Sequence, residues 1–539
     1  MRTLQEIFVR NNWIFYLIIV LLLFPALLIN IGVLPFIDDE SIRALVSMEM
    51  IFSGDYITPT IAGELYFKKP PVFNWLVVLF YKVSGNFNDA TLRYVSVFSL
   101  LIYGFIIYQF SKEYLGKRNA IMVSLMFITC GRILFYDSFY GLIDIAYSAL
   151  VYMSIMLIWH YFKKEYFLLL FLVSYGLTAV TFLMKGLPSI YYQGVSLLVI
   201  FISEKKFRKL FSWKHLSGIF LFIGIIGLYY TLYLVRNPGN LQKIFQVLFT
   251  ESSEKTALGF NVAATVKYFL TFPFQFTYHF LPWTIWIIYF LRKDIRQIIF
   301  KNPFIRINLY LFIFNILIYW FSPNTFARYL FVHAPMMFII LVYLHQIHKE
   351  ENTLHFRLQN IIFICMGVIF VLIPFFYPVL NITKDVPHAV LKSIVLILLS
   401  AVSLLFLIRS KNQKLLIVVM MLLIGRIGFD WFIFPSREKT NLLSQCRDEA
   451  ITVGKETLGH DLHLLRGIPM STHPLYYISR ERKEQLKWTD DISDPEAYYV
   501  IDESTFNGPE YDKYFEFHLR YNMVPISVVK FKHEVKENF

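Results

Sequence analysis

The chain has 539 residues, of which 57% are hydrophobic and 18% aromatic, while only 17% are charged. A soluble globular domain carries about 25% charged residues, and 55 Phe with 35 Tyr exceed what one soluble core can hide. A mean hydropathy of +0.53 is typical of a chain that lies in lipid. Three Cys in this length exclude a disulfide scaffold. Composition therefore indicates an integral membrane protein.

Thirteen apolar stretches are long enough to cross a bilayer as helices, which takes roughly 20 residues each. They predict an all-α polytopic membrane protein with spans at 13–34, 90–110, 119–136, 140–162, 166–183, 187–203, 216–235, 272–291, 304–321, 328–347, 358–379, 388–408 and 413–434. The first stretch is too long for a signal peptide and lacks a clear small-residue cleavage site, so we expect a retained anchor.

Charge placement tests this count independently. If the N-terminus is cytoplasmic, the basic residues fall on every second loop, as the positive-inside rule requires. The cytoplasmic side then holds Arg2, Arg10, Lys112, Lys117, Arg118, Lys163, Lys164, Lys205, Lys206, Arg208, Lys209, Lys214, Arg292, Lys293, Arg296, Lys301, Arg409, Lys411 and Lys414. The net charge of +13 is therefore a topology signal, and no nucleic-acid partner is expected.

Two long loops and the C-terminal segment are expected on the opposite face. Loop 35–89 is acid-rich, and its segments 41–53 and 72–83 are predicted to be helices at the membrane interface; loop 236–271 is the second long one. Residues 436–539 hold 14 Lys and Arg against 18 Asp and Glu, a net charge of −4 that leaves +17 for residues 1–435. Short β-type runs at Tyr498–Ile501 and Ile526–Phe531 and a helical pattern at Glu438–Leu458 predict a small α/β domain there.

Ionisable side chains gather at the outer ends of the predicted spans, where contact with lipid makes them costly. Such a layer suits a substrate with a lipid tail and a phosphate at headgroup level. Lys and Arg would hold the phosphate, and an Asp could accept a proton from an attacking hydroxyl. The layer comprises Asp38, Asp39, Glu40, Lys68, Lys69, Asp144, Lys185, Arg328 and Tyr329.

Several of these residues also have a simpler interpretation. Lys185 alone could reach the interface as any lysine at a helix end does. Asp38 and Asp39 could cap the helix that begins near Ser41, because acids favour helix N-termini. Asp137, between two spans, is expected to be solvated. A carboxylate inside an apolar helix needs a partner, however, so a purely structural role explains Asp144 less well.

Three blocks of the first loop keep a recognisable order: Asp39–Glu40, Glu49–Pro59 and Tyr66–Pro71. They resemble the polyprenyl-phosphate-sugar-dependent glycosyltransferases, which include the bacterial aminoarabinose transferase of lipid A and, more remotely, the protein O-mannosyltransferases. Later segments are similar to further motifs of that family and occur in its order: Asp144, Met184–Pro188, Leu281–Trp283, Ser322–Pro323, Arg328–Tyr329 and Pro335.

The resemblance implies a GT-C fold of about thirteen spans (1–435) with a soluble extracytoplasmic C-terminal domain (436–539). It implies transfer of a sugar from an undecaprenyl-type phosphate donor to an extracytoplasmic acceptor such as lipid A, another lipid or a glycan, with inversion. The expected location is the bacterial inner membrane, with the active site and C-terminal domain in the periplasm. The resemblance implies that Asp39 is the catalytic acid of the first loop, that Lys69 with Tyr329 binds the donor phosphate, and that Asp144 supports the acceptor or catalytic geometry. We also expect Glu40 and Asp144 among the catalytic residues, and Lys68, Lys185 and Arg328 at the donor phosphate.

One position departs from the family pattern. The aminoarabinose transferases carry an acid immediately before the conserved Lys, where this chain has Lys68, so the metal-binding role of that acid is not carried over. A divalent metal is compatible with the family, but no residue pattern here supports one. Two adjacent Lys favour an anionic donor or acceptor; the alternative is that Lys68 faces water.

Other functions stay open at this point. One is a protein O-mannosyltransferase-like enzyme that acts on Ser or Thr. Another is a transporter or flippase of lipid-linked sugars, which would predict an internal repeat and charges near the membrane midplane, and the sequence shows neither. A scaffold protein would leave Asp144 and Lys185 unexplained.

Overall fold

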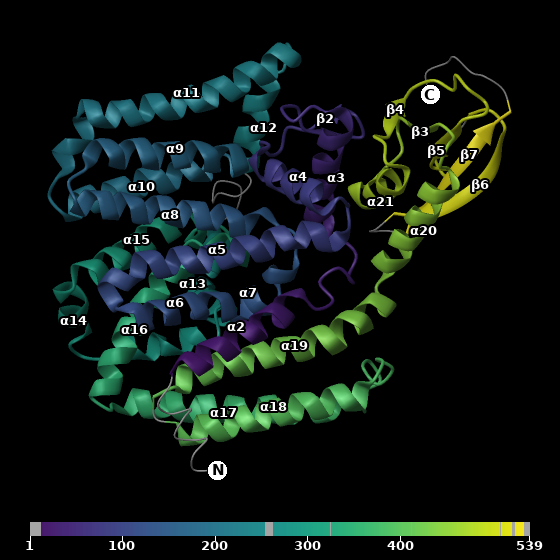
Figure 1. Ribbon diagram of the computed structural model, residues 1–539. Helices are drawn as coiled ribbons and strands as arrows, with labels where there is room; N and C mark the ends of the chain where they lie inside the picture. The colour runs from purple at the N-terminus through teal and green to yellow at the C-terminus, as the bar shows by residue number, and fades with distance from the viewer. Residues whose placement is uncertain are drawn as a thin grey trace.

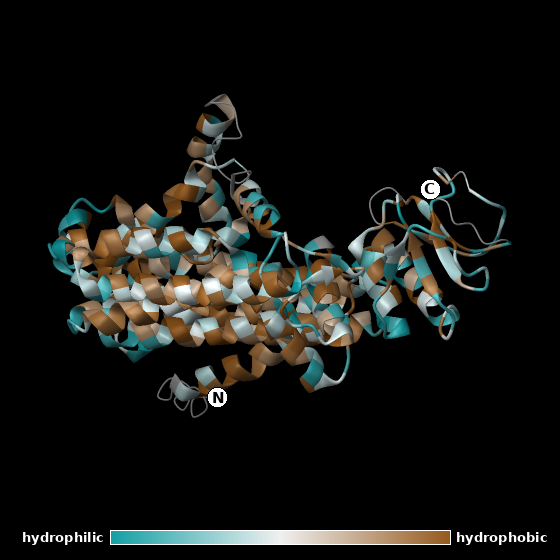
Figure 2. Cartoon of the chain, turned by 90° about the horizontal axis from the view of Figure 1, so that it is seen from above, coloured by the Kyte–Doolittle hydropathy of each residue, from teal (hydrophilic) through white to brown (hydrophobic). Residues whose placement is uncertain are grey.

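A computed structural model describes residues 12–253, 262–323, 325–410, 412–506, 508–519 and 523–532. Long helices lie side by side in a slab, and a small mixed domain lies beyond one end of it (Figure 1). Hydrophobic residues cover the helices along the slab, whereas hydrophilic residues gather near its ends and in the small domain (Figure 2). The predicted class, an all-α polytopic membrane protein with a C-terminal α/β region, is confirmed.

Each of the thirteen predicted spans coincides with helical structure. Within the described residues, eight of them are single helices long and apolar enough to cross a membrane. These are α5 (Asp89–Leu115), α8 (Ile143–Lys163), α9 (Phe167–Lys185), α11 (Trp213–Arg236), α15 (Pro303–Trp320), α17 (Leu354–Phe376), α18 (Ala389–Arg409) and α19 (Lys414–Thr440).

The other five spans are shorter helices or helices in two pieces. They are α2 (Asn12–Leu28), α6 (Lys117–Thr129) with α7 (Gly131–Phe135), α10 (Pro188–Ser203), α13 (Val262–His279) with the 3₁₀ helix η4 (Trp283–Leu291), and the 3₁₀ helix η5 (Ala327–Leu330) with α16 (Ala334–Glu350). Two of the interruptions meet, because the N–H of Gly131, the first residue of α7, donates to the Leu281 carbonyl, between α13 and η4, at 2.6 Å. Each backbone break thus satisfies a polar group of the other inside the slab.

The first external loop folds into α3 (Asp38–Ser53), the two-stranded β1 (Thr60–Ile61) and β2 (Glu64–Leu65), and α4 (Val72–Ser84). Both predicted interfacial helices are therefore present. Each ends at a glycine with a left-handed backbone, Gly54 at φ +71° and Gly85 at φ +68°, a conformation that favours glycine. From the second loop, α12 (Leu241–Ser253) lies beside these elements (Figure 1); residues 254–261 are outside the described ranges.

The small domain contains α20 (Leu442–Glu456), β3 (Leu462–Leu465), α21 (Thr472–Arg482), β4 (Lys487–Thr489), β5 (Tyr498–Ile501), β6 (Tyr511–His518) and β7 (Pro525–Phe531). Its five strands have the order β4-β3-β5-β7-β6: β3 is parallel to β4 and β5, and β7 is antiparallel to β5 and β6. The predicted runs at 498–501 and 526–531 are β5 and most of β7. The predicted boundary at 435 falls inside α19, which continues to Thr440.

The slab end away from the small domain carries the basic loops. They include η2 (Phe207–Phe211) and α14 (Ile295–Lys301). Ion pairs connect the loops to one another, such as Arg306 with Glu204 at 2.8 Å, and Arg292 donates to Glu351 at 3.0 Å. The predicted basic positions Arg2, Arg10 and Lys411 lie outside the described residues. The end that faces the small domain carries α3, α4 and α12 (Figure 1), and the predicted site residues lie there.

Candidate active site

Four elements bring charged side chains together at the slab end that faces the small domain. Asp39 lies in the first turn of α3, Asp144 in the first turn of α8, Lys185 in the last turn of α9, and Arg328 in η5. In sequence these residues are between 41 and 289 positions apart, yet ion pairs join them in the order Asp39, Arg328, Asp144 and Lys185. We call them the charged layer.

Asp39 occupies the open side of the charged layer. Its side chain is 50% exposed, and its Oδ2 accepts a hydrogen bond of 2.7 Å from Nη2 of Arg328. The Glu40 carboxylate accepts from the Ile37 N–H at 3.0 Å and therefore serves as the N-terminal cap of α3. Glu40 rather than Asp39 therefore caps the helix. Arg328 binds one oxygen of Asp39, and half of the Asp39 side chain faces solvent.

Asp144 is the buried centre of the charged layer, with only 5% of its side chain exposed. Oδ1 accepts a short hydrogen bond from Nζ of Lys185, and Oδ2 lies 3.3 Å from Nε of Arg328 in an ion pair. The simple interpretation of Lys185, a side chain reaching out to the interface, is wrong, because 10% of that side chain is exposed and it points at Asp144. A buried carboxylate between two cations satisfies the requirement that buried charges be paired.

Aromatic rings complete the surroundings of Lys185. Its Nζ lies 4.3 Å from the ring centre of Tyr329 and 5.0 Å from that of Tyr147. These cation–π contacts help to direct the ammonium. The Tyr147 hydroxyl lies 3.2 Å from Ser189 Oγ, so its ring is anchored on α10. Sequence reasoning missed Tyr147, although it follows Asp144 by three residues and must share its helix face.

Lys68 and Lys69 lie in the connection between β2 and α4. Lys68 is exposed, and Lys69 is half-buried. Phe67, which directly precedes the pair, and Val72, the first residue of α4, pack against a hydrophobic cluster that includes Phe182, in the last turn of α9. The pair is thereby placed beside the helix end that carries Lys185.

Glu40, predicted as catalytic, lies in a closed network. It is fully buried, and its carboxylate accepts from Nε of Arg93 at 2.9 Å, from Nη2 of Arg93 at 3.1 Å and from the Gly141 N–H at 2.7 Å. Arg93 also donates to the backbone carbonyls of Ile31 and Leu34, at 2.7 and 2.8 Å. All strong acceptor positions of Glu40 are used inside the protein, so its geometry fits a positioning residue that holds the chain leading into α3.

A second buried acid, Asp137, lies near the charged layer. Asp137, in η1 (Asp137–Phe139), is 2% exposed, so the expectation that it is solvated is wrong. Its Oδ2 accepts from Nε of Arg132 at 2.5 Å. Its charge acts on both Arg328 and Asp144. Asp137 therefore contributes to the field that positions Arg328.

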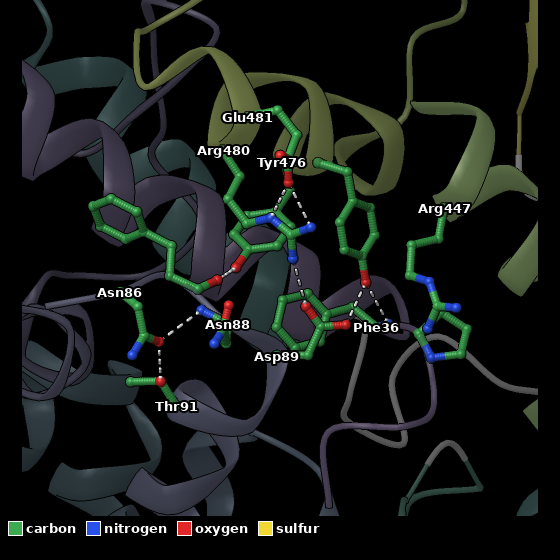
Figure 3. Close-up of polar contacts among 12 residues, drawn as sticks. Phe36, Asn86, Asn88, Asp89, Thr91, Arg447, Tyr476, Arg480 and Glu481 are labelled. Atoms are coloured by element: carbon green, nitrogen blue, oxygen red, sulfur yellow. Dashed lines mark hydrogen bonds and ion pairs between the residues drawn. The ribbon is translucent and has the colours of Figure 1, made fainter. Parts of the chain in front are cut away.

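The small domain clamps the segment that leads into Asp39 (Figure 3). The Phe36 N–H donates to the hydroxyl of Tyr477 at 3.2 Å, and that hydroxyl donates to Asp89 Oδ2 at 2.7 Å. Nη1 of Arg480 approaches Oδ1 of the same carboxylate at 3.3 Å, and Nη1 of Arg447 donates to the Val33 carbonyl at 2.9 Å. Helices α20 and α21 thus fix the backbone three to six residues before Asp39.

The far end of α3 is held from the same domain. Glu49 is buried, and its carboxylate accepts from Gln485 at 2.7 Å, from the Thr60 hydroxyl at 2.6 Å and from the Ala62 N–H at 2.6 Å. Burial raises the pKa of Glu49, and these hydrogen bonds partly offset that rise. Both ends of the helix that presents Asp39 are therefore fixed by contacts outside it.

The charged layer can neutralise an anion and accept a proton. Lys185 and Arg328 supply donors for a phosphate, and Asp39 offers a half-exposed carboxylate beside them. Within the described ranges, no three His, Cys, Asp or Glu side chains gather as a metal site would require. The sequence analysis predicted all four residues that these ion pairs connect, namely Asp39, Asp144, Lys185 and Arg328.

Comparison with known proteins gives matches by sequence and by fold. The family model described as dolichyl-phosphate-mannose-protein mannosyltransferase matches residues 68–230. An uncharacterized protein of Aquifex aeolicus (strain VF5) is 26% identical over 231 residues, which cover 41% of this chain and 45% of that protein. The undecaprenyl phosphate-alpha-4-amino-4-deoxy-L-arabinose arabinosyl transferase of Pseudomonas paraeruginosa (strain DSM 24068 / PA7) is 27% identical over 152 residues, 28% of this chain and 27% of that protein. The chain thus spans less than half the length of these curated relatives.

A likeness in fold extends over almost the whole molecule. The crystal structure of ArnT from Cupriavidus metallidurans bound to undecaprenyl phosphate superposes with a TM-score of 0.69 at 16% identity, covering 96% of this chain and 98% of that one. The apo structure of the same protein gives a TM-score of 0.66, also at 16% identity, with 96% and 97% covered. The helical slab and the small domain thus both have counterparts in a solved structure.

Proposed function

We propose that the chain is a GT-C glycosyltransferase that moves a sugar from an undecaprenyl-type phosphate carrier to an extracytoplasmic acceptor. The family match over residues 68–230, the similarity to an arabinosyl transferase and the likeness in fold to ArnT support this proposal. The acceptor is lipid A, another lipid or a glycan. The observation that carries this proposal is the charged layer, in which Asp39 lies open to solvent beside the paired Arg328, Asp144 and Lys185.

The cations stabilise the leaving phosphate group. When the bond between the anomeric carbon and the phosphate oxygen breaks, the phosphate of the carrier departs with the bonding electrons and gains negative charge. Lys185 and Arg328 are already directed into the layer by Asp144, so little reorganisation is needed to neutralise that charge. Lys69 and the adjacent Lys68 bind the same phosphate from the loop that precedes α4. Asp144 acts here as a positioning residue, because both of its oxygens are committed to the two cations.

Asp39 acts on the acceptor as a general base. An acceptor hydroxyl forms the new bond to the anomeric carbon and gives its proton to the open oxygen of Asp39, while Arg328 holds the other oxygen. Attack opposite to the departing phosphate is a single displacement, so the anomeric configuration inverts. An acceptor that is itself a phosphate is already ionised near neutral pH, and Asp39 would then orient it rather than take a proton.

The distribution of charge supports a membrane orientation for this proposal. The basic loops gather at the slab end opposite the charged layer, and the positive-inside rule places that end in the cytoplasm. The charged layer and the small domain then face the periplasm of a bacterial inner membrane.

One other acceptor class has a specific observation in its favour: the matching family model, over residues 68–230, is that of protein mannosyltransferases, which suggests Ser or Thr side chains.

Mass spectrometry of the cell envelope tests this function directly. Lipids, glycans and glycoproteins are compared between cells with the gene, cells without it, and deleted cells that carry it on a plasmid. We expect one sugar mass to disappear with the gene and return with the plasmid, which identifies donor sugar and acceptor together. A protein-linked loss assigns the Ser or Thr acceptor. No change in any lipid, glycan or glycoprotein would contradict the transferase proposal.

A further inference from the structure

A cavity lies at the other end of the slab, away from the charged layer. It has a volume of about 370 Å³ and lies between α2, α6, α16, α17 and α19. Helix α16 connects the two regions, because Arg328 and Tyr329 lie just before its first residue and Lys349 lies in its last turn. At about 1.5 Å per residue, a helix of this length separates them by roughly 25 Å. The cavity is therefore not part of the proposed active site.

Cations dominate the lining of this cavity. Arg118, Lys349 and Lys414 line it, against the single carboxylate of Glu350. Arg118 lies close enough to Lys349 for their like charges to act on each other. Like charges held together at the mouth of a partly enclosed site raise the free energy of the empty state, and a bound anion removes that cost.

A buried amide provides an independent sign of a ligand. Gln359 lines the cavity and is fully buried. Its Oε1 accepts from the Tyr289 hydroxyl at 2.9 Å, and that hydroxyl also lies 3.0 Å from Nδ1 of His345. Its Nε2 has no hydrogen-bond partner among the described residues. A buried donor without a partner costs about 1–3 kcal/mol, so an acceptor in the cavity would be stabilised there.

The surroundings favour a lipid as the source of that acceptor. Tyr16 of α2 lines the cavity, and its neighbours Trp13 and Leu17 are exposed apolar side chains on the same helix. On α17, Leu358 and Ile361 flank Gln359 and are also exposed. A phosphate that binds in the cavity beside these lipid-facing helices can leave its acyl chains along the slab. The basic loops at this end are the pattern that attracts anionic lipids.

We propose that this cavity binds the phosphodiester headgroup of an anionic membrane phospholipid. Arg118 and Lys349 neutralise the phosphate, and the Gln359 amide donates to one of its oxygens. The same chemistry would recognise free phosphate, so the source must be tested. This site is distinct from the charged layer and stands independently of the proposed transfer reaction.

The test measures lipid retention by the full chain. Wild type, Arg118→Gln/Lys349→Gln and Gln359→Met are purified in mild detergent, exposed to mixed micelles of phosphatidylglycerol and phosphatidylcholine, and analysed by native mass spectrometry. Lys164→Gln is the matched control, since it removes a charge from an exposed residue at the same slab end that does not line the cavity. A second arm adds inorganic phosphate as competitor.

We expect wild type and Lys164→Gln to retain phosphatidylglycerol in preference to phosphatidylcholine, and the double variant to bind it at least about tenfold more weakly, the loss expected for charge-assisted bonds. Gln359→Met should show a smaller loss. Equal retention of phosphatidylglycerol by wild type and the double variant would overturn the proposal. Displacement by inorganic phosphate, with no preference between the two lipids, would overturn the lipid source and assign the cavity to soluble phosphate.

Discussion

Asp39 and Glu40 are neighbours in one helical turn, yet they belong to two different ionic networks. Glu40 is buried, and its oxygens are bound by Arg93 and by backbone N–H groups. Asp39 is half-exposed, and Arg328 holds one of its oxygens. The closed network fixes the entry into α3, while the open network presents a carboxylate beside two cations. An acid contributes to shape when all its acceptors are used, and it can contribute to chemistry when one is left accessible.

The first prediction removes the closed network. Glu40→Gln leaves the Arg93 guanidinium buried without its counter-ion, and breaking a buried pair in this way costs about 3–5 kcal/mol. We expect a large drop in the thermal midpoint of the purified protein, with turnover per folded molecule much less affected. Asp39→Asn is the control, because its half-exposed side chain should leave the midpoint nearly unchanged. If Glu40→Gln folds normally and loses turnover, Glu40 belongs with the catalytic residues and the comparison fails.

The second prediction concerns how pH acts on the clamp from the small domain. His473, in α21, is 1% exposed, and burial lowers its pKa to about 4, aided by the charge of Arg447. A histidine whose folded pKa lies below its unfolded value stays neutral in the folded state, so stability is lost as pH falls from the unfolded towards the folded pKa. Between pH 7 and pH 5 this loss amounts to about 2 kcal/mol.

Thermal midpoints at pH 7 and pH 5 check this expectation. His473→Leu removes the titrating group, so the difference between the two midpoints should shrink relative to wild type. An equal difference in both proteins would show that His473 does not weaken the clamp at low pH.

The third prediction removes a cation from the open network. Lys185→Gln takes away a charge-assisted donor, so we expect the KM for the lipid-phosphate donor to rise about tenfold. Lys185→Arg should recover much of the affinity, and the thermal midpoint reports separately on the unpaired Asp144. A donor KM that stays at the wild-type value in Lys185→Gln would remove Lys185 from phosphate binding.

The fourth and smallest prediction concerns Lys68. An exposed charge near a bound phosphate acts through solvent, so Lys68→Glu should weaken donor binding roughly threefold to fivefold at low salt, and less at high salt. Lys164→Glu, a matched exposed charge at the other end of the slab, should have no effect. Equal donor affinity in wild type and Lys68→Glu would mean that Lys68 only faces water.

Much of the architecture could be predicted from the sequence because apolar periodicity and loop charge are local signals. The interruptions within two spans could not, since the break at Gly131 is stabilised by the Leu281 carbonyl, which is distant in sequence. The domain boundary was placed at a change in composition, but α19 continues past it to Thr440 because helix formation does not stop where hydrophobicity does.

In the site, the sequence identified the residues but not their partners. A sequence motif does not distinguish the roles of two adjacent acids, so Asp39 and Glu40 were both predicted as catalytic. Only the position of Arg93, 53 residues after Glu40, distinguishes them. An arginine near the start of an apolar span was the available signal, because such a charge needs a counter-ion. The expectation that Asp137 is solvated was wrong for the same reason, since its burial depends on Arg132 and on the packing of η1.

The central claim is that the open oxygen of Asp39 takes part in sugar transfer. The most direct measurement is the rate at which the gene-dependent sugar product forms in membranes that contain equal amounts of folded wild type or Asp39→Asn. Loss of a positioned general base predicts a rate about 10²–10⁴-fold lower, with the thermal midpoint and undecaprenyl phosphate binding nearly unchanged. A rate for Asp39→Asn close to that of wild type would contradict the account.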